Sequence, residues 1–218
     1  LMHQTINGNE AILQMEHAGD YPDIIVGCTG GGSNLAGLMF PFLGQQLRGG
    51  QKIDIIGCEP LSCPSFTKGK YAYDHGDMAR MTPLIKMHTL GSDFLPPANH
   101  SGGLRYHGMS YHLSHLYDLG LMRAKAYGQK DCFEAGVIFG KQEGIIPAPE
   151  GNHAVKGAID AALECKEKGE SKTILFNLCG HGHFDMTAYD DYFSGKLADD
   201  FYDEASANQS LSQLPEIA

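Results

Sequence analysis

The sequence predicts an α/β fold, a parallel sheet flanked by helices, and three observations support this prediction. Two continuous apolar runs, residues 22–28 and 53–60, are typical of buried strands. The segment between them has helical spacing, and strand, helix and strand in that order form a βαβ unit with a parallel pair. Glycine-rich turns follow two apolar runs, as ligand-binding loops do at the carboxyl ends of parallel strands. We expect one domain over residues 1–197 and an acidic tail over residues 198–218.

The N-terminal elements follow from apolar spacing. A first helix is expected over residues 9–17. The helix after the first strand should be kinked by Pro41, and its apolar stripe consists of Leu35, Leu38, Met39, Phe42 and Leu43. Residues 61–107 differ, because they are rich in Gly, Pro, Tyr, His and Met and show no long period. A loop of this length is more often functional than passive, and a surface excursion without a function is the alternative.

Regular patterns return after this segment. We expect a helix over residues 109–119, a short strand over 121–127 and a helix over 132–143. Another helix begins at Glu150, and a last buried strand covers residues 173–178. The apolar residues expected to face inward on the two later helices are Phe133, Val137, Ile138, Phe139, Val155, Ala158, Ile159, Ala162 and Cys165. The tail should be ordered only by docking or by a partner.

Composition argues against several kinds of partner. The formal net charge is -10, and an acidic surface repels both nucleic acid and anionic membranes. No apolar stretch approaches the roughly 20 residues that a membrane span requires. The six cysteines include no CxxC pair, which argues against a zinc site. Four of them, Cys28, Cys58, Cys165 and Cys179, lie within or beside apolar runs, which favours reduced thiols and a cytoplasmic location over disulfides. The first residues do not resemble a signal peptide. Because the chain begins with Leu1 and not with an initiator methionine, we expect it to be a fragment or a processed piece.

The strongest local motif is the run Gly30, Gly31, Gly32, Ser33 and Asn34, between a buried strand and a helix. Successive glycines let an anion approach the backbone, and the start of a helix offers free N–H groups and a positive dipole end. The motif therefore predicts a site for a phosphate monoester. The alternative is a plain turn in which Ser33 caps the helix. The run matches neither a Walker loop nor GxGxxG, so a dinucleotide is not favoured.

Two further motifs point to the same edge of the sheet. Cys179 and Gly180 begin a glycine-rich turn after the last strand, and His181 and His183 lie within it. The two histidines are either metal ligands or structural turn residues. Glu150 follows two prolines at a helix start, where the dipole stabilises a carboxylate. A capping role alone is the alternative for Glu150.

Taken together, these segments resemble tryptophan synthase β chains, and in particular their second type. The resemblance spans residues 3–191, and the block 101–108 is what indicates the second type. The segments that carry it are 22–38, 57–60, 101–110, 143–153 and 178–185. The resemblance implies a fold-type II enzyme dependent on pyridoxal 5'-phosphate (PLP), with two α/β domains and the cofactor between them. The present chain would correspond to the larger, phosphate-binding domain.

The resemblance also implies roles for individual residues. The loop of residues 30–34 would hold the PLP phosphate, and Glu150 would lie near the ring and its 3'-oxygen. Cys179 occupies the place of a serine that bonds the pyridine nitrogen, with Gly180 beside it. A neutral partner leaves that nitrogen unprotonated, which favours β-elimination and β-replacement. A thiol is also a neutral partner for the pyridine nitrogen, but it is a weaker hydrogen-bond donor than a hydroxyl.

Arg105 departs from the first-type pattern, in which an aspartate contacts the hydroxyl of serine. A guanidinium reverses the charge and suits a phosphate, so we hypothesise that the donor is O-phosphoserine rather than L-serine. A structural ion pair of Arg105 is the alternative. The family also implies a monovalent cation, K⁺ or Na⁺, bound by the backbone carbonyls of Gly30, Tyr106 and Gly108.

No catalytic residue is assigned in this chain. The family's Schiff-base lysine follows a histidine in an N-terminal segment, and Lys52, Lys68, Lys70 and Lys86 have no preceding histidine. The implied function is thus that of the C-terminal part of a PLP-dependent lyase, which joins indole to L-serine or O-phosphoserine and yields L-tryptophan. We expect the fragment alone to be inactive.

Three other readings remain: a related threonine or cysteine synthase, which the residues around Arg105 argue against; a non-catalytic phosphate- or PLP-binding module or partner subunit; and a phosphate-binding domain without PLP. The resemblance implies a homodimer, completed by an N-terminal segment that could be a separate chain. It leaves open whether a tryptophan synthase α chain binds.

Overall fold

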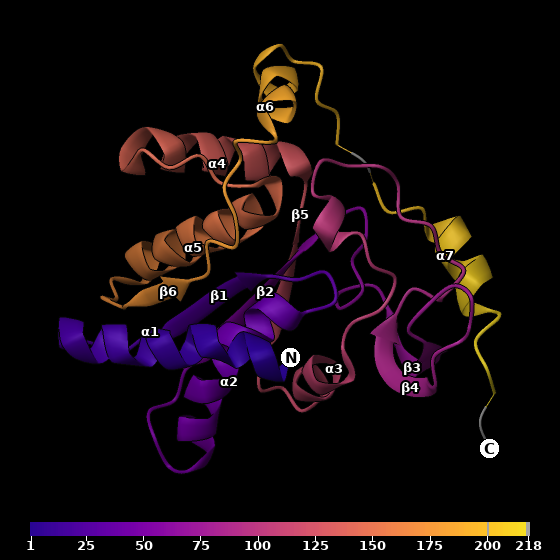
Figure 1. Ribbon diagram of the computed structural model, residues 1–218, viewed down its shortest axis with the longest axis horizontal. Coiled ribbons are helices and arrows are strands. Elements are labelled where there is room, and N and C mark those ends of the chain that lie inside the picture. The colour runs from indigo at the N-terminus through magenta and orange to yellow at the C-terminus, as the bar shows by residue number, and fades with distance from the viewer. Residues whose placement is uncertain (200, 217–218) are drawn as a thin grey trace.

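Four parallel strands form the central sheet, in the order β5-β2-β1-β6 (Figure 1). This computed structural model describes residues 1–199 and 201–216. The sheet strands are β1 (Ile24–Cys28), β2 (Asp54–Pro60), β5 (Arg123–Tyr127) and β6 (Ile174–Phe176). β1 pairs in parallel with β2, from Ile24 opposite Asp54 to Cys28 opposite Cys58. The predicted α/β fold with a parallel sheet is therefore confirmed.

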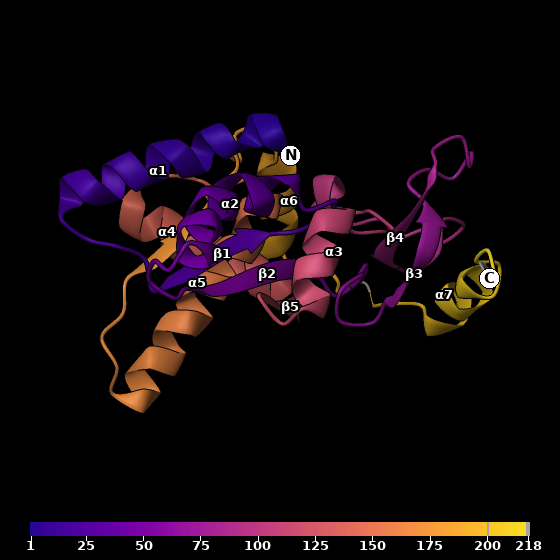
Figure 2. The ribbon, with the colours of Figure 1, turned by 90° about the horizontal axis from the view of Figure 1, so that it is seen from below.

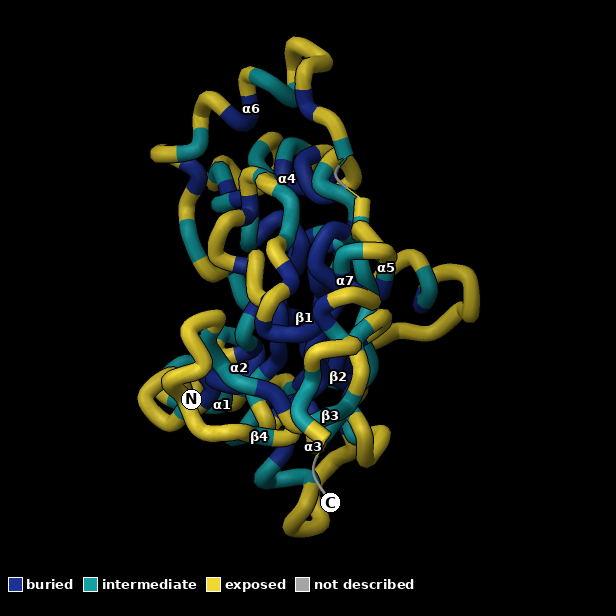
Figure 3. Tube along the Cα trace, turned by 90° about the vertical axis from the view of Figure 1, so that its right-hand side faces the viewer, coloured by how far each residue is buried: buried dark blue, intermediate teal, exposed yellow. Residues whose placement is uncertain are grey.

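Helices cover both faces of this sheet (Figures 1 and 2). Their bounds are α1 (Thr5–Ala18), α2 (Ser33–Leu47), α3 (Tyr111–Asp118), α4 (Gln129–Glu143) and α5 (Pro149–Lys168). Alternate residues of β1 serve the two faces: Ile25 packs in the cluster of α2, and Val26 packs in the cluster of α5. Figure 3 shows the buried chain concentrated along β1 and β2. Such two-sided burial explains why these strands are continuous apolar runs.

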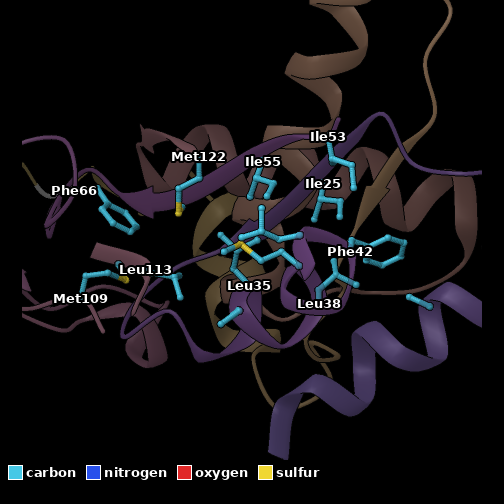
Figure 4. Packing of buried hydrophobic residues seen from close by; sticks show 14 residues of the cluster. Ile25, Leu35, Leu38, Phe42, Ile53, Ile55, Phe66, Met109, Leu113 and Met122 are labelled. Atoms are coloured by element: carbon cyan, nitrogen blue, oxygen red, sulfur yellow. The ribbon is translucent and has the colours of Figure 1, made fainter. Parts of the chain in front are cut away.

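The largest hydrophobic cluster lies between the sheet and α2 (Figure 4). Leu35, Phe42, Ile25 and Ile55 are almost fully buried there. The predicted stripe of α2 faces this cluster, although the helix continues four residues beyond Leu43. Pro41 lies inside the helix. The stripe therefore fixes how α2 sits on the sheet.

Helix α1 begins earlier than expected. It starts at Thr5 rather than Asn9, and it includes Gly8, which has a low intrinsic helix propensity. Gly8 lies where α1 crosses α2, because an added Cβ would come within 2.7 Å of the Gly37 carbonyl oxygen. Close helix packing thus overrides the local preference that placed the start at Asn9.

Residues 61–107 contain regular structure that the sequence did not reveal. Strands β3 (Lys70–His75) and β4 (Leu84–Thr89) pair as an antiparallel hairpin, and a short 3-10 helix covers Gly102–Leu104. Another 3-10 turn, Met2–Gln4, precedes α1. The expectation of a segment without regular elements was therefore wrong. Helix α3 packs against β4, so the hairpin is attached beside the sheet domain (Figure 2).

Some side chains expected to be buried are not. Ile138 of α4 is 46% exposed, and Ala162 of α5 is also exposed. The last strand was expected to be buried, but every residue of β6 is only half-buried. The reason is its position, since β6 is an edge strand of the described sheet. An apolar run does not reveal whether a strand lies at the centre or at the edge.

The C-terminal region packs at two separate places. Helix α6 (Met186–Phe193) lies on α4, where the rings of Tyr189 and Phe133 are 4.9 Å apart. Helix α7 (Glu204–Leu211) lies beside the β3–β4 hairpin (Figure 2), with Ala207 buried in a cluster that includes Phe94. The expected 198–218 tail is thus docked over much of its length; residues 200, 217 and 218 lie outside the description. None of the described helices is both long and apolar enough to span a membrane.

Candidate functional site

Four loops meet at the carboxyl ends of the strands. The loop after β6 is joined to the approach to α5, because the Ala148 N–H donates to the Gly180 carbonyl at 3.0 Å. The loop after β1 touches the 3-10 helix, since a Cβ on Gly30 would lie 2.7 Å from the Gly103 carbonyl oxygen. The Gly103 N–H in turn donates to Glu150 Oε1 at 2.9 Å. The three predicted motifs therefore converge on one site.

The glycine loop leaves backbone donors free at the start of α2. The N–H groups of residues 30–35 donate to no backbone carbonyl in the described part of the chain, and no side chain caps the helix. Gly32 is the N-cap, with φ of 91°, and Ser33 is exposed. The alternative in which Ser33 caps the helix is therefore wrong. Free N–H groups and the positive end of the helix dipole together form a cradle for an anion.

The glycines of this loop have different roles. A Cβ on Gly32 would lie 2.7 Å from both Leu113 Cδ2 and Met109 Sδ, so packing requires a glycine there. Gly31 faces open space, with only Tyr106 within 4 Å of an added Cβ. Gly31 and Ser33 line a hollow of about 330 Å³ beside the loop. This hollow lies between the loop and the hairpin, and its lining residues do not include Glu150 or Cys179.

Asn34 does not point freely into this space. Its Nδ2 donates to Cys28 Sγ at 3.2 Å, and its Oδ1 accepts from Asn177 Nδ2. Asn34 therefore ties the first turn of α2 to the ends of β1 and β6. The assignment of Asn34 to the phosphate site stays a prediction; in the structure its side chain is hydrogen-bonded to Cys28 and Asn177.

Two cysteines lie together beneath the loop. Cys28 Sγ and Cys179 Sγ are 3.5 Å apart, with Cys28 buried and Cys179 exposed. The hydrogen bond with Cys28 lowers the pKa of the Cys179 thiol. The same contact, followed by burial, raises the pKa of Cys28. Either sulfur could donate in this contact, so the opposite shifts in pKa both come from one shared hydrogen bond between the two thiols.

Glu150 reaches across to another loop. It is the second residue of α5, after Pro149, as the sequence predicted. Its carboxylate accepts from the Gly103 N–H, and α5 has no side-chain cap, so a capping role alone does not describe it. Glu150 therefore holds the 3-10 helix of residues 102–104 against the site.

Arg105 lies exposed on the same loop. Its guanidinium donates to the Pro96 carbonyl at 2.5 Å. Within the described ranges no carboxylate forms an ion pair with it, so the alternative of a structural ion pair is wrong. Most of its N–H donors are thus left for other partners.

The residues expected to bind a cation are less clearly arranged. The Tyr106 carbonyl accepts from the Cys63 thiol at 2.9 Å, and Gly108 forms an isolated bridge with Thr89. The rings of His181 and His183 are 4.8 Å apart, but the described chain contains no cluster of three or more His, Cys, Asp or Glu residues that could hold a metal. The carbonyl site of Gly30, Tyr106 and Gly108 stays a prediction.

Sequence reasoning missed three residues of this site: Cys28, Gly103 and Asn177. Cys28 ends β1 directly before the glycine loop, and Asn177 follows the last residue of β6. Because parallel strands end at the same edge, the last residues of both apolar runs could have been assigned to the site. Gly103 carried no comparable signal, since its contact with Glu150 crosses 47 positions.

A parallel α/β sheet with an anion cradle at the carboxyl ends of its strands is typical of proteins that bind a phosphate-bearing ligand. Comparison with known proteins identifies the family. The model of the family described as "Pyridoxal-phosphate dependent enzyme" matches residues 4–180. The chain belongs to this family. A fungal L-serine ammonia-lyase from Rhizomucor miehei has a TM-score of 0.62 at 15% identity, and covers 89% of this chain and 56% of its own. A threonine deaminase has a TM-score of 0.55 at 16% identity, with 83% and 51% covered.

Within the family, the resemblance to tryptophan synthase β chains is confirmed. The chain is 57% identical over 202 residues to "Tryptophan synthase beta chain 2" of Aquifex aeolicus, covering 91% of the chain and 46% of the relative. It is 56% identical over 197 residues to the protein of that name from Methanosarcina mazei, covering 90% and 45%. It is 50% identical over 215 residues to "Tryptophan synthase beta chain" of Pyrococcus horikoshii, covering 99% and 46%. The chain thus spans about half the length of these relatives.

Proposed function

We propose that this chain is the C-terminal part of a tryptophan synthase β-type lyase, which joins indole to L-serine or O-phosphoserine and yields L-tryptophan. The observation that carries the proposal is the cradle of free N–H groups over residues 30–35, beside the exposed thiol of Cys179. A phosphate monoester with a ring attached fits this combination of an anion site and a neutral donor. The identity of 50–57% to relatives named as tryptophan synthase β chains supports the particular reaction.

Each residue of the site has a proposed task. The N–H groups of residues 30–34 bind the phosphate of PLP, and the α2 dipole favours its charge. Cys179 lies at the pyridine nitrogen, with Gly180 beside it, and Glu150 lies near the 3'-oxygen while holding Gly103. Asn34 orients the first turn of α2 through Cys28 and Asn177. Bound PLP supplies the withdrawal of electrons that stabilises negative charge on the amino-acid substrate.

The lysine that holds the cofactor in this family is proposed to come from an N-terminal segment. No lysine of this chain follows a histidine, as the family's lysine does. We therefore expect the 218-residue chain alone to bind PLP weakly and to be inactive. A polypeptide carrying the N-terminal half of a relative should restore activity on mixing.

The cradle is tested by measuring PLP affinity from the change in cofactor absorbance. Gly31→Asp places a carboxylate where the phosphate would bind, so the dissociation constant should rise by about ten-fold or more, at least 1.4 kcal/mol. Gly44→Asp makes the same change near the other end of α2 and should leave the affinity unchanged. Equal affinities for both variants would contradict the proposed phosphate site.

The reaction is tested by mixing this chain with an N-terminal half and measuring L-tryptophan from indole and each donor. Product formation supports the lyase. A stable complex that binds PLP but forms no product from either donor would favour the alternative, a non-catalytic PLP-binding module. Intact mass after PLP and borohydride should show no adduct on this chain by itself, and an adduct on one of its lysines would contradict the missing-lysine proposal.

Arg105 is proposed to recognise the phosphate of O-phosphoserine. Its exposed guanidinium makes one hydrogen bond, to Pro96, which leaves a fork of donors suited to an anion. In the mixed enzyme, Arg105→Ala should lower kcat/KM for O-phosphoserine by about ten-fold and leave L-serine unchanged. Arg48→Ala, at the far end of α2, is the control. Equal effects on both donors would contradict this role.

The remaining proposals concern assembly and ions. We propose a cytoplasmic homodimer and a K⁺ or Na⁺ ion at the carbonyls of Gly30, Tyr106 and Gly108. Light scattering of the purified protein measures the first, and a monomer at micromolar concentration would contradict it. PLP affinity compared in K⁺, Na⁺ and a bulky organic cation measures the second, and equal affinities would contradict it.

A further inference from the structure

The Cys28–Cys179 pair is suited to covalent chemistry. The two sulfurs are 3.5 Å apart, although 151 positions separate the residues, because β1 and β6 are neighbouring strands that end at the same edge. All six cysteines are free thiols, and Cys28 and Cys179 are the one pair in the described chain whose sulfurs form a hydrogen bond with each other. The strand order itself thus creates a dithiol at the floor of the candidate cofactor site.

The two thiols differ in accessibility. Cys179 is exposed and the other five cysteines are buried, so a small reagent in solution reaches Cys179 first. The hydrogen bond between the two thiols lowers the pKa of Cys179, which raises the fraction of Cys179 present as the nucleophilic thiolate. Cys28 lies directly behind it, where a second thiol is needed to resolve an oxidised sulfur. An exposed attacking thiol with a buried resolving thiol is the arrangement that forms a disulfide in two steps.

We propose that Cys28 and Cys179 form a reversible disulfide in the presence of hydrogen peroxide, and that this modification weakens ligand binding at the candidate cofactor site. In the first step the Cys179 thiolate attacks the peroxide oxygen, an S–O bond forms, the O–O bond breaks, and hydroxide leaves. In the second step Cys28 attacks the sulfenic sulfur, the S–S bond forms, and hydroxide leaves and takes up the Cys28 proton as water. Overall, two thiols are oxidised and one molecule of hydrogen peroxide is reduced.

The movement required is small. A disulfide bond is about 2.05 Å long, so the sulfurs must approach by roughly 1.5 Å. The loop that carries Cys179 follows the half-buried edge strand β6, and it is held to the neighbouring loop by two backbone hydrogen bonds, at Ala148 and Gly182. This loop has no strand on its outer side in the described sheet, so it can shift toward β1.

The disulfide would change the site in two ways. It removes the Cys179 thiol from the ligand side, and it alters the sulfur of Cys28 to which Asn34 donates at 3.2 Å. Because Asn34 holds the first turn of α2, the phosphate cradle loses one of its two side-chain anchors. This consequence for PLP rests on the proposed function, whereas the disulfide itself does not.

Intact mass and thiol counting test the modification. After a stoichiometric amount of hydrogen peroxide, the protein should lose about 2 Da, two hydrogen atoms, and two of its six titratable thiols. Dithiothreitol should reverse both changes, and peptide mapping should link residues 28 and 179. Cys28→Ser should instead accumulate a sulfenic acid on Cys179 that dimedone traps. Cys165→Ala, a change in a cysteine distant from this pair on α5, should form the disulfide as the unmodified protein does.

The results separate the modification from the cofactor site. Oxidation of Cys179 to the sulfinic acid without cross-linking, or a 2 Da loss that persists in Cys28→Ser, would overturn the proposed disulfide. If the disulfide forms, PLP affinity should fall by about ten-fold and recover on reduction. If the disulfide forms and PLP affinity does not change, the proposed effect of the disulfide on ligand binding is overturned. Failure of the reduced protein to bind PLP would overturn the proposed function and leave the disulfide result standing.

Discussion

The sheet domain differs in its stabilising groups from residues 61–107, which contain the β3–β4 hairpin and are called the hairpin region here. Around β1 and β2 the buried side chains are apolar, and Ile25, Leu35 and Phe42 have no exposed surface. Around the hairpin several buried side chains are polar, among them Asp74 and Thr89. The first region is stabilised by apolar area removed from water, and the second depends on the pairing of each polar group.

Asp74 is the centre of a hydrogen-bond network in the hairpin, whereas both ring nitrogens of the buried His88 on β4 have no partner in the described chain. Asp74 accepts from the Thr89 hydroxyl at 2.6 Å and from the His75 N–H at 2.7 Å. His107 Nε2 lies 2.9 Å from the His75 carbonyl. Near the end of β2, Glu59 accepts from the N–H groups of Phe66 and Thr67 and from the Thr67 hydroxyl, and so binds the sheet to the start of the hairpin region. Apolar periodicity in the sequence therefore predicts the sheet domain. The hairpin region could not be predicted in this way, because specific pairs of polar residues leave no periodic pattern in the sequence.

The largest effect is expected in the sheet domain. Phe42→Ala removes a fully buried ring from the cluster between α2 and the sheet, and should lower the free energy of unfolding by about 3–5 kcal/mol. Urea unfolding measures this loss. Phe193→Ala removes a ring that is 67% exposed and should change stability by less than about 0.5 kcal/mol. Equal losses for the two variants would contradict the placement of this cluster.

The next effect is a pH dependence, and it concerns Glu59, a residue of β2 whose carboxylate binds the start of the hairpin region. Burial raises the pKa of Glu59 from 4.5 to about 7, so the folded protein retains a proton that the unfolded chain has released. The contribution of Glu59 to stability should therefore fall as pH rises from about 4.5 to 7, by up to roughly 3 kcal/mol. His153 has the opposite sign, because burial lowers its pKa to about 4 and stability rises through pH 4 to 6.5.

Comparison with Glu59→Gln isolates the Glu59 contribution, since His153 is present in both proteins and cancels. The unfolding free energy of the unmodified protein minus that of the variant should decrease as pH rises from 5 to 7, because the amide of the variant does not titrate. Urea unfolding at each pH measures it. A difference that does not vary with pH would show that Glu59 titrates as it does in the unfolded chain.

A smaller loss is expected within the hairpin network. Asp74→Ala leaves the Thr89 hydroxyl and the His75 N–H without their acceptor, and should cost about 2–3 kcal/mol. Asp54→Ala is the matched control, because Asp54 is partly exposed and pairs with Arg123 at the surface. That change should cost at most about 1 kcal/mol. If the two costs were the same, the buried network would not distinguish the hairpin region.

The smallest effect concerns the N-terminal cap of α7, the helix that lies beside the hairpin region. Asp203 caps α7 and accepts from the N–H groups of Ala205 and Ser206, both at 3.1 Å. Asp203→Ala should destabilise this helix by about 1 kcal/mol, seen as faster amide hydrogen exchange confined to α7. Asp190→Ala, on the exposed side of α6, should leave exchange in α7 unchanged. Unchanged exchange in both variants would mean that the cap does not hold α7.

The sequence alone determined the elements whose signals are local. The apolar runs of β1 and β2, the glycine loop before Ser33 and the position of Glu150 at the start of α5 all depend on residues within a few positions of each other. Local backbone preference and apolar spacing are sufficient for such features, so the parallel sheet and its cradle were predictable.

Only the tertiary structure decided the contacts between distant segments. The sulfur pair of Cys28 and Cys179 and the bond from Gly103 to Glu150 join residues 151 and 47 positions apart. Ile138 is apolar at helical spacing and yet exposed, because no described element covers that part of α4. The physical reason is that spacing along the chain reports which face of an element is apolar, while strand order and loop closure decide what that face or loop end meets.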